Sequence, residues 1–213
     1  MTISLRKYLL TATMHDMHQE FFDRLAAEWD LTFTAEDLER LQHVVNNMPV
    51  HRGMQILDLG CGTGILFDML RRLVGTRGSV TGVDFSMEMA QKAHRNFPFA
   101  NVHVVDADAS ELPFGANLFD MAVAFAAFPH FVHQQRALDE LHRVLKPGAR
   151  FYILHLQSSK ELAAIHHRVG GAVAKDTLPS AENLRQMFAS GQFYDIRIED
   201  HPGLFLASAT NAE

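Results

Sequence analysis

The chain has 213 residues, of which 47% are hydrophobic and 21% are charged, a balance typical of a globular domain with a sizeable core. No apolar stretch approaches the roughly 20 residues of a membrane-spanning helix, and residues 1–7 lack the pattern expected of a secretory signal. The single cysteine, Cys61, excludes an internal disulfide and favours a reducing, cytoplasmic location. The net charge of −6, with its basic residues scattered, disfavours nucleic acid as a partner, so we expect a small-molecule substrate.

Residues 1–48 are expected to be helical. Phe21, Phe22, Leu25 and Trp29 recur at helical spacing, and a second apolar series at 38, 41 and 45 predicts another helix. The pair Thr34 and Asp37 fits a capping box at the start of that second helix.

From residue 54 onward, short apolar runs alternate with helical segments. Strands are predicted at 55–59, 79–83, 102–105, 119–125 and 150–154, and helices near 65–74, 87–96, 133–145, 159–168 and 181–189. This alternation indicates a parallel sheet with helices on both faces. Two final strand-like runs, 194–198 and 204–208, have no helix between them and predict an antiparallel pair at the sheet edge, turning at 201–203.

The strongest motif is the sequence Ile-Leu-Asp-Leu-Gly-Cys-Gly-Thr-Gly at 56–64, between the first predicted strand and the following helix. Glycines at 60, 62 and 64 allow the backbone to pass close beneath a ligand, and the start of the helix offers free N–H groups. The Gly-x-Gly-x-Gly spacing differs from the Gly-x-Gly-x-x-Gly fingerprint of dinucleotide sites, and no Gly-Lys-Ser/Thr follows. The motif therefore disfavours a nicotinamide dehydrogenase and excludes a phosphate-binding P-loop.

Two carboxylates are placed to bind a nucleoside. Asp84 ends the second strand, where it would accept hydrogen bonds from both ribose hydroxyls, while Ser86 is the better N-cap for the next helix. After the third strand, Asp106 and Asp108 compete for a role at an adenine amino group.

These motifs together resemble a known family. The segments are Leu-Asp-Leu-Gly-Cys-Gly-Thr-Gly at 57–64, Val-Asp-Phe-Ser-Met-Glu-Met at 83–89, Asp-Ala-Ser-Glu-Leu-Pro-Phe at 108–114, Phe-Asp at 119–120 and Arg-Val-Leu-Lys-Pro-Gly at 143–148. In this order and spacing they are similar to class I S-adenosylmethionine (SAM)-dependent methyltransferases, in the branch of the ubiquinone- and menaquinone-biosynthesis C-methyltransferases. The likeness covers about residues 54–156.

The resemblance implies a Rossmann-like α/β fold, with a seven-stranded, mostly parallel sheet, helices on both faces and a C-terminal antiparallel strand pair. It also implies a SAM site in which the glycine turn underlies the methionine part, Asp58 anchors the amino end, Asp84 holds the ribose and Asp108, rather than Asp106, takes the adenine amino group. The expected cofactor-binding residues are Asp58, Gly60, Cys61, Gly62, Thr63, Gly64, Asp84, Phe85, Ser86, Met89, Asp108, Ala109 and Phe125.

The methyl acceptor is expected beside the segment that follows the fourth strand. Phe125, Phe128 and Phe131 offer aromatic faces to a sulfonium or a flat acceptor, although at least one of them is expected to be core. The helices that carry Phe22 and Trp29 resemble the lid of such enzymes, which would exclude water.

The chain contains thirteen histidines, an unusually large number. His130 and His155 follow the fourth and fifth strands and are the candidates for a catalytic contact with the acceptor, with an imidazole as general base. Alternatively, His155, His166 and His167 could bind a transition metal that activates a soft nucleophile such as a thiolate. Pro129 stands where many members of the branch have a second histidine, which weakens the transfer of a role to His130.

We expect one domain spanning 1–213, with a helical lid at 1–48, a SAM-binding core at 54–156, and acceptor-side helices and edge strands at 157–213. The expected function is methyl transfer to a small molecule by in-line displacement. A macromolecular methyltransferase and a non-catalytic SAM-binding module remain the alternatives, and the identity of the acceptor and the oligomeric state stay open.

Overall fold

The N-terminal part of the structure, a computed structural model that describes residues 13–213, is helical. Helix α1 spans Met14–Leu25, a short 3₁₀-helix η2 spans Trp29–Thr32, and α2 spans Ala35–Asn46. The predicted capping box of Thr34 and Asp37 is present at the start of α2, and Thr13 and Asp16 form another at α1. The helical prediction for residues 1–12 lies outside the described residues.

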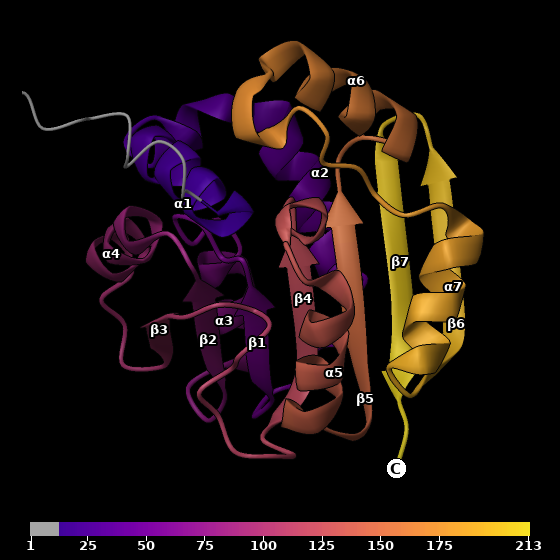
Figure 1. The fold of residues 1–213 in the computed structure, drawn as a ribbon. Helices are drawn as coiled ribbons and strands as arrows, with labels where there is room; N and C mark the ends of the chain where they lie inside the picture. The colour runs from indigo at the N-terminus through magenta and orange to yellow at the C-terminus, as the bar shows by residue number, and fades with distance from the viewer. Residues whose placement is uncertain (1–12) are drawn as a thin grey trace, which may run out of the picture.

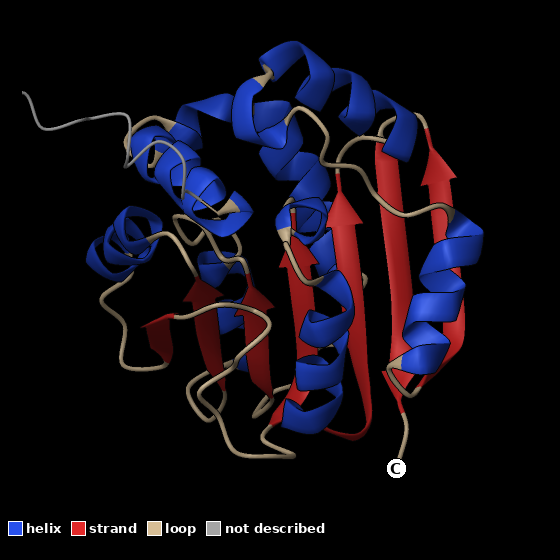
Figure 2. Cartoon of the chain, in the orientation of Figure 1, coloured by secondary structure: helices blue, strands red, loops and turns tan. Residues whose placement is uncertain are grey.

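Seven strands form one sheet in the order β3-β2-β1-β4-β5-β7-β6 (Figures 1 and 2). The strands are β1 (Gln55–Leu59), β2 (Ser79–Asp84), β3 (Val102–Asp106), β4 (Phe119–Phe125), β5 (Leu145–His155), β6 (Phe193–His201) and β7 (Leu204–Asn211). The pairs among β1 to β5 are all parallel, and β7 is antiparallel to both β5 and β6. The predicted fold class is therefore confirmed.

The remaining helices cover both faces of the sheet. They are α3 (Phe67–Val74), α4 (Met87–Asn96), α5 (Gln134–Val144), α6 (Ser159–Val169) and α7 (Ala181–Ser190), with short 3₁₀-helices η3 (Phe128–His130) and η4 (Gly171–Val173). Alternate residues of each buried strand point to opposite faces, so that Ile56 packs with α2 and α3, whereas Leu57 packs with α5.

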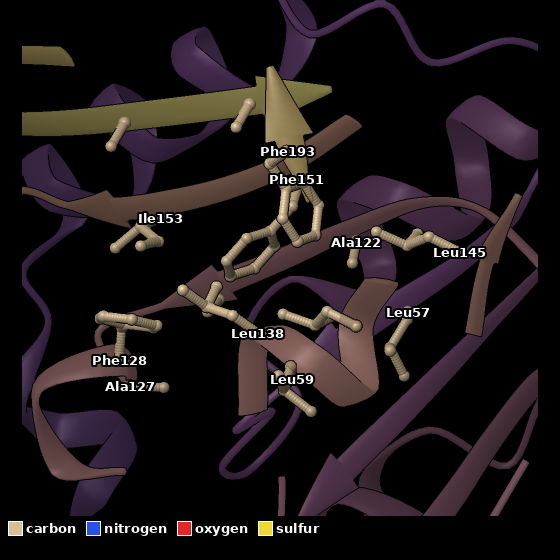
Figure 3. Close-up of a cluster of buried hydrophobic side chains, with 14 of the residues drawn as sticks. Leu57, Leu59, Ala122, Ala127, Phe128, Leu138, Leu145, Phe151, Ile153 and Phe193 are labelled. Carbon is tan, nitrogen blue, oxygen red and sulfur yellow. The ribbon is translucent and has the colours of Figure 1, made fainter. Parts of the chain in front are cut away.

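Large apolar side chains fill the layer between the sheet and helices α5 and α7. Phe151 of β5 packs against Phe188 of α7 and Phe193 of β6, with ring centroids 6.2 and 6.5 Å away (Figure 3). Leu138 of α5 is fully buried in the same cluster. This packing fixes the sheet as a rigid base for the loops at the carboxyl ends of its strands.

Several strands extend beyond their predicted boundaries, β5 and β6 among them. Strand β5 begins at Leu145 rather than 150, because Leu145 already pairs with Phe119 of β4. Strand β6 continues to His201, and the predicted turn follows it, with Gly203 at a φ of +83°.

The order of the strands reverses between β1 and β4, which are neighbours in the sheet. Ligands of open α/β sheets bind at the carboxyl ends of the strands near such a point. In Figure 1, α1 and α6 lie over this edge, above the arrowheads of the parallel strands. Among the described residues, no helix has both the length and the apolar character needed to cross a bilayer.

Candidate active site

The glycine turn after β1 depends on backbone conformations that favour glycine. Gly60, Gly62 and Gly64 have φ values of +71°, +54° and +89°. A Cβ atom on Gly60 would lie 2.4 Å from the Cβ of Ala127, so the backbone of the β4–η3 loop passes directly against the turn. The N–H groups of Gly60 and Cys61 donate to the Val83 carbonyl oxygen at 2.7 and 2.9 Å, which fastens the turn to β2.

Asp84, at the end of β2, links this turn to the start of α4. Its buried carboxylate accepts hydrogen bonds from the N–H of Gly62 at 2.7 Å and from the N–H of Ser86 at 2.9 Å. Burial raises the pKa of Asp84 to about 6. Ser86 caps α4 as expected, because its hydroxyl oxygen accepts from the Met89 N–H at 3.2 Å.

Asp58 of β1 is the second buried carboxylate of the site, with only 1% of its surface exposed. Its Oδ2 atom has no hydrogen-bond partner among the described residues. Burial, and then the neighbouring Asp84, raise its pKa to about 8. A buried carboxylate without a partner is costly, and a ligand cation beside it would remove that cost.

A concave pocket opens above these residues, in the form that is usual for small-molecule sites. Its wall is mostly apolar, and it is lined by Phe22, Trp29, Phe33, Asp58, Gly60, Cys61, Gly62, Ile65, Leu66, Asp84, Phe85, Met89, Phe125, Ala126, Ala127, His130 and Phe131. Thr63 and Gly64 do not line it: Thr63 is bonded to Asp30, and Gly64 packs against Phe67 and Phe97.

A smaller pocket adjoins the cavity and contains Asp108 and Ala109 beside Phe85. Asp108 accepts from the Ser110 N–H at 2.6 Å, and its other oxygen lies 3.0 Å from Nδ1 of His15 on α1. Asp106 instead lines a separate depression beside α4. The two aspartates that compete on sequence grounds are thus separated by the fold, with only Asp108 beside the cavity.

The N-terminal helices are hydrogen-bonded across the cavity. Gln19 donates to the Phe85 carbonyl oxygen at 3.1 Å, and Asp23 accepts from the Ser86 hydroxyl at 2.6 Å. Lys92 of α4 forms an ion pair with Asp30 of η2 at 2.8 Å. Phe22 and Trp29 therefore become part of the cavity wall, where sequence reasoning expects the lid.

The aromatic residues after β4 divide into two groups. Phe125 and Phe131 line the cavity, whereas Phe128 is fully buried in the α5 layer and belongs to the core. Ala126, between them, has a φ of +53°, a left-handed conformation that alanine rarely adopts and that is often found at functional sites.

A cluster of histidines meets one carboxylate beside the part of the cavity wall that His130 lines. Asp176 Oδ2 lies 2.8 Å from Nε2 of His18 and 2.7 Å from Nδ1 of His130. Nδ1 of His166 lies 2.7 Å from the backbone oxygen of Asp176. The cluster joins α1, η3, α6 and the segment before α7 (Figure 1).

The other predicted histidines occupy different places. His155 is buried, its two ring nitrogens have no partner among the described residues, and it lines neither the cavity nor the adjoining pocket. Burial lowers its pKa to about 3. This differs from the expectation of an acceptor contact, because the His155 side chain packs toward Phe205 of β7.

The expected metal set of His155, His166 and His167 is not assembled. His166 is buried, but His167, one position further along α6, is exposed. The donor atoms that do converge in the described part of the chain belong to His18, His130 and Asp176, within 4.8 Å of one another.

Sequence reasoning missed His18 and Asp176 as site residues. The spacing of His15 and His18 places both on one face of α1, where they contact Asp108 and Asp176. Asp176 lies 158 residues from His18 along the chain, and no local motif marks it.

The chain is similar to known methyltransferases in sequence. Residues 57–153 match the family model described as a methyltransferase domain. The chain is 31% identical over 185 residues to the demethylmenaquinone methyltransferase of Staphylococcus aureus (strain MRSA252), an alignment that covers 76% of this chain and 77% of that protein. It is 29% identical over 206 residues to the ubiquinone/menaquinone biosynthesis C-methyltransferase UbiE of Blochmanniella floridana, covering 83% and 81% of the two chains.

The fold also has solved relatives. A chain from the complex of the Haloferax volcanii Trm112 methyltransferase activator with a methyltransferase superposes with a TM-score of 0.75 at 22% identity. The match covers 90% of this chain and 98% of that chain, and it supports the same sheet with the same arrangement of helices.

Proposed function

Since the chain belongs to the class I SAM-dependent methyltransferases, in the branch of the ubiquinone and menaquinone C-methyltransferases, we propose that it methylates a small, flat organic acceptor of the quinol type. The names of the two relatives refer to demethylmenaquinone and to ubiquinone and menaquinone biosynthesis. The aromatic wall formed by Phe22, Trp29 and Phe131 would suit a quinone-like ring. The acceptor would be methylated by in-line displacement.

The observation that carries the proposal is the pair of buried carboxylates beneath the cavity. Oδ2 of Asp58 has no hydrogen-bond partner in the part of the chain that the structure describes, and a ligand's ammonium group would supply one. Asp84 would accept from ribose hydroxyls while it retains its bond from the Gly62 N–H. The close approach of Gly60 to Ala127 leaves no room for a larger side chain beneath the ligand.

SAM would supply an activated methyl group on a sulfonium. The protein's own contribution would be to orient both ligands and to exclude water. Phe85 and Met89 would flank the adenine, with Asp108 and Ala109 at its edge after His15 has moved away from Asp108. The N-terminal helices would act as the lid over the acceptor.

Isothermal titration with SAM and with S-adenosylhomocysteine (SAH) tests this function directly. We expect the wild type to bind both ligands and Asp84→Ala to lose at least about tenfold in affinity, because hydrogen bonds to a charged group contribute about 1.5–3 kcal/mol each. Asp106→Ala is the matched control, since Asp106 is exposed and lies outside the cavity. Binding of NAD in place of both ligands would contradict the proposal.

A further inference from the structure

Resting on the methyl transfer proposed above, we propose that His130 is the general base of the reaction and that Asp176 and His18 position it. The acceptor is then a phenol or hydroquinone whose hydroxyl gives its proton to Nε2 of His130. The proposal follows from where the protons of this buried cluster must lie. It concerns two residues, His18 and Asp176, that lie outside the motifs of the glycine turn and the adenine pocket.

An ionised carboxylate and a backbone carbonyl oxygen only accept hydrogen bonds. Asp176 Oδ2 faces Nε2 of His18 at 2.8 Å and Nδ1 of His130 at 2.7 Å, so each of these nitrogens donates to it. The second nitrogen of His18, Nδ1, lies 2.8 Å from the carbonyl oxygen of Met14 and donates as well. His18 therefore carries both ring protons and is an imidazolium cation that balances the charge of Asp176.

His130 has the opposite role in the cluster. Its Nδ1–H is committed to Asp176, and burial of the ring holds its pKa below the usual range, so the ring is neutral at neutral pH. Nε2 then carries the lone pair. Nε2 has no hydrogen-bond partner among the described residues, and His130 lines both the main cavity and the adenine-side pocket. The free lone pair is thus at the wall of the acceptor site.

Asp176 is itself held from two sides. Nδ1 of His166 on α6 lies 2.7 Å from its backbone oxygen, and its own N–H donates to the Val173 carbonyl oxygen in η4 at 3.0 Å. A carboxylate held in this way fixes the tautomer and orientation of the neighbouring imidazole, which is the role of the acidic residue in catalytic triads on unrelated folds.

His18 makes the arrangement depend on helix α1. The helix lies over the cavity through Gln19, Asp23 and His18 itself, and only in this position does His18 reach Asp176. Helix α1 therefore both covers the acceptor and supplies the cation that balances Asp176. Closing this helix over the cavity would also place His18 against Asp176, and so would orient His130 as the base.

The reaction balances with one proton released in each turnover. The acceptor hydroxyl transfers its proton to Nε2 of His130, and the oxyanion, through oxygen or through its conjugated ring carbon, forms the bond to the methyl carbon. The methyl–sulfur bond breaks with its electron pair on sulfur, which gives SAH. After attack at oxygen, His130 passes its proton to water; after attack at carbon, the ring proton goes to water and the oxygen recovers the proton from His130.

The protonation states are tested by heteronuclear NMR of isotope-labelled histidine rings in the full chain with SAH bound. We expect His130 as the Nδ1–H tautomer and His18 doubly protonated at neutral pH, with both signals shifted in Asp176→Asn. His142, whose Nδ1 bonds Asn211 at 2.7 Å far from the cavity, is the internal control. A His130 proton on Nε2, a neutral His18, or a stoichiometric metal bound to the same preparation would overturn the proposal.

The acceptor class is tested with hydroquinone, catechol, thiophenol and aniline probes in one SAH-release assay. We expect transfer to the hydroxyl probes, with kcat lowered about 10²–10⁴-fold in Asp176→Asn and KM little changed. The decrease in kcat of Asp176→Asn should be smaller for nitrocatechol, whose hydroxyl is already ionised in solution. A purely structural role of Asp176 would not produce this difference between acceptors. Asp195→Asn, at an exposed position on β6, should retain wild-type rates.

Transfer only to the thiol or amine probe, no transfer to any hydroxyl probe, or an equal loss for acidic and weakly acidic phenols would overturn the assignment. The two proposals fail separately. If the wild type does not bind SAH, the proposed methyl transfer is refuted. If it binds SAH but His130 carries its proton on Nε2, only the role assigned to His130, Asp176 and His18 is refuted.

Discussion

At the scale of single residues, burial separates two aspartates that each end a strand. Asp84 and Asp106 end neighbouring parallel strands and face each other in the ladder. Asp84 is buried and bonded to two backbone N–H groups, whereas Asp106 is exposed and has its carboxylate outside the cavity. The difference comes from the glycine turn, which approaches Asp84 and not the edge strand.

Gly60→Ala tests how closely the turn depends on glycine. The new Cβ would lie 2.4 Å from Ala127, at a φ of +71°. Left-handed strain costs about 1–2 kcal/mol and overpacking about 1–3 kcal/mol. We therefore expect a loss of about 2–5 kcal/mol in the free energy of unfolding, measured by urea denaturation. SAH affinity should fall in the same variant.

Gly115→Ala is the matched control, because a Cβ there meets nothing within 4 Å. We expect its unfolding midpoint and SAH affinity to stay close to those of the wild type. Equal stability of the two variants would show that the turn tolerates a side chain.

The residues of this turn were predictable because their constraint is local. Three glycines within five positions, after an apolar strand, need no knowledge of distant contacts. The histidine cluster was not predictable in the same way, since His18, His130 and Asp176 come from segments far apart in sequence. His130 could be placed from its position after a strand, but its partner could not.

At the scale of elements, helix α6 is connected to the β6–β7 turn at its first residues. Ser158 and Glu161 form a capping box, and the same Glu161 carboxylate accepts from the Gly203 N–H at 2.9 Å. The connection orients a helix whose other end carries His166 against Asp176. The start of α6 thus helps to hold the segment that carries Asp176.

Ser158→Ala should remove the cap and destabilise the protein by about 1 kcal/mol, which is typical for the loss of an N-cap hydroxyl. Urea unfolding monitored by circular dichroism measures the loss. Ser158→Thr retains a capping hydroxyl and should remain within a few tenths of a kcal/mol of the wild type. If alanine and threonine have the same effect, the cap contributes nothing to stability.

Elements were predicted more accurately than their ends. Nearly continuous burial along β4 and along the second half of β5 reflects a sheet covered on both faces, and this is readable as apolar runs. The early start of β5 depends on pairing with Phe119 across the sheet, a partner that the Lys-Pro-Gly sequence at 146–148 does not reveal.

At the scale of the whole molecule, the two buried carboxylates link stability to pH. Their pKa values are about 8 for Asp58 and about 6 for Asp84, both raised from 3.8. The folded protein therefore retains protons that the unfolded chain has lost. The contribution of these two groups to stability without ligand falls as the pH rises from 3.8 to about 6 for Asp84 and to about 8 for Asp58.

We expect the free energy of unfolding without ligand to be lower at pH 8 than at pH 6, with the opposite trend for SAH affinity. The ligand's ammonium and hydroxyl groups would pair with ionised carboxylates, so we expect binding to release protons and to strengthen as the pH rises. Thermal denaturation with and without SAH measures both trends. Asp58→Asn should flatten the upper part of the stability profile, and an unchanged slope would show that Asp58 titrates normally.

Cys61 gives the covered cavity a practical consequence. The thiol is the chain's only cysteine, it is 7% exposed in the cavity wall, and burial raises its pKa well above the usual range. We expect an alkylating reagent to reach the thiol only when the N-terminal helices move away from the cavity. The modification rate of Cys61 would therefore report how often the cavity opens, without any added label.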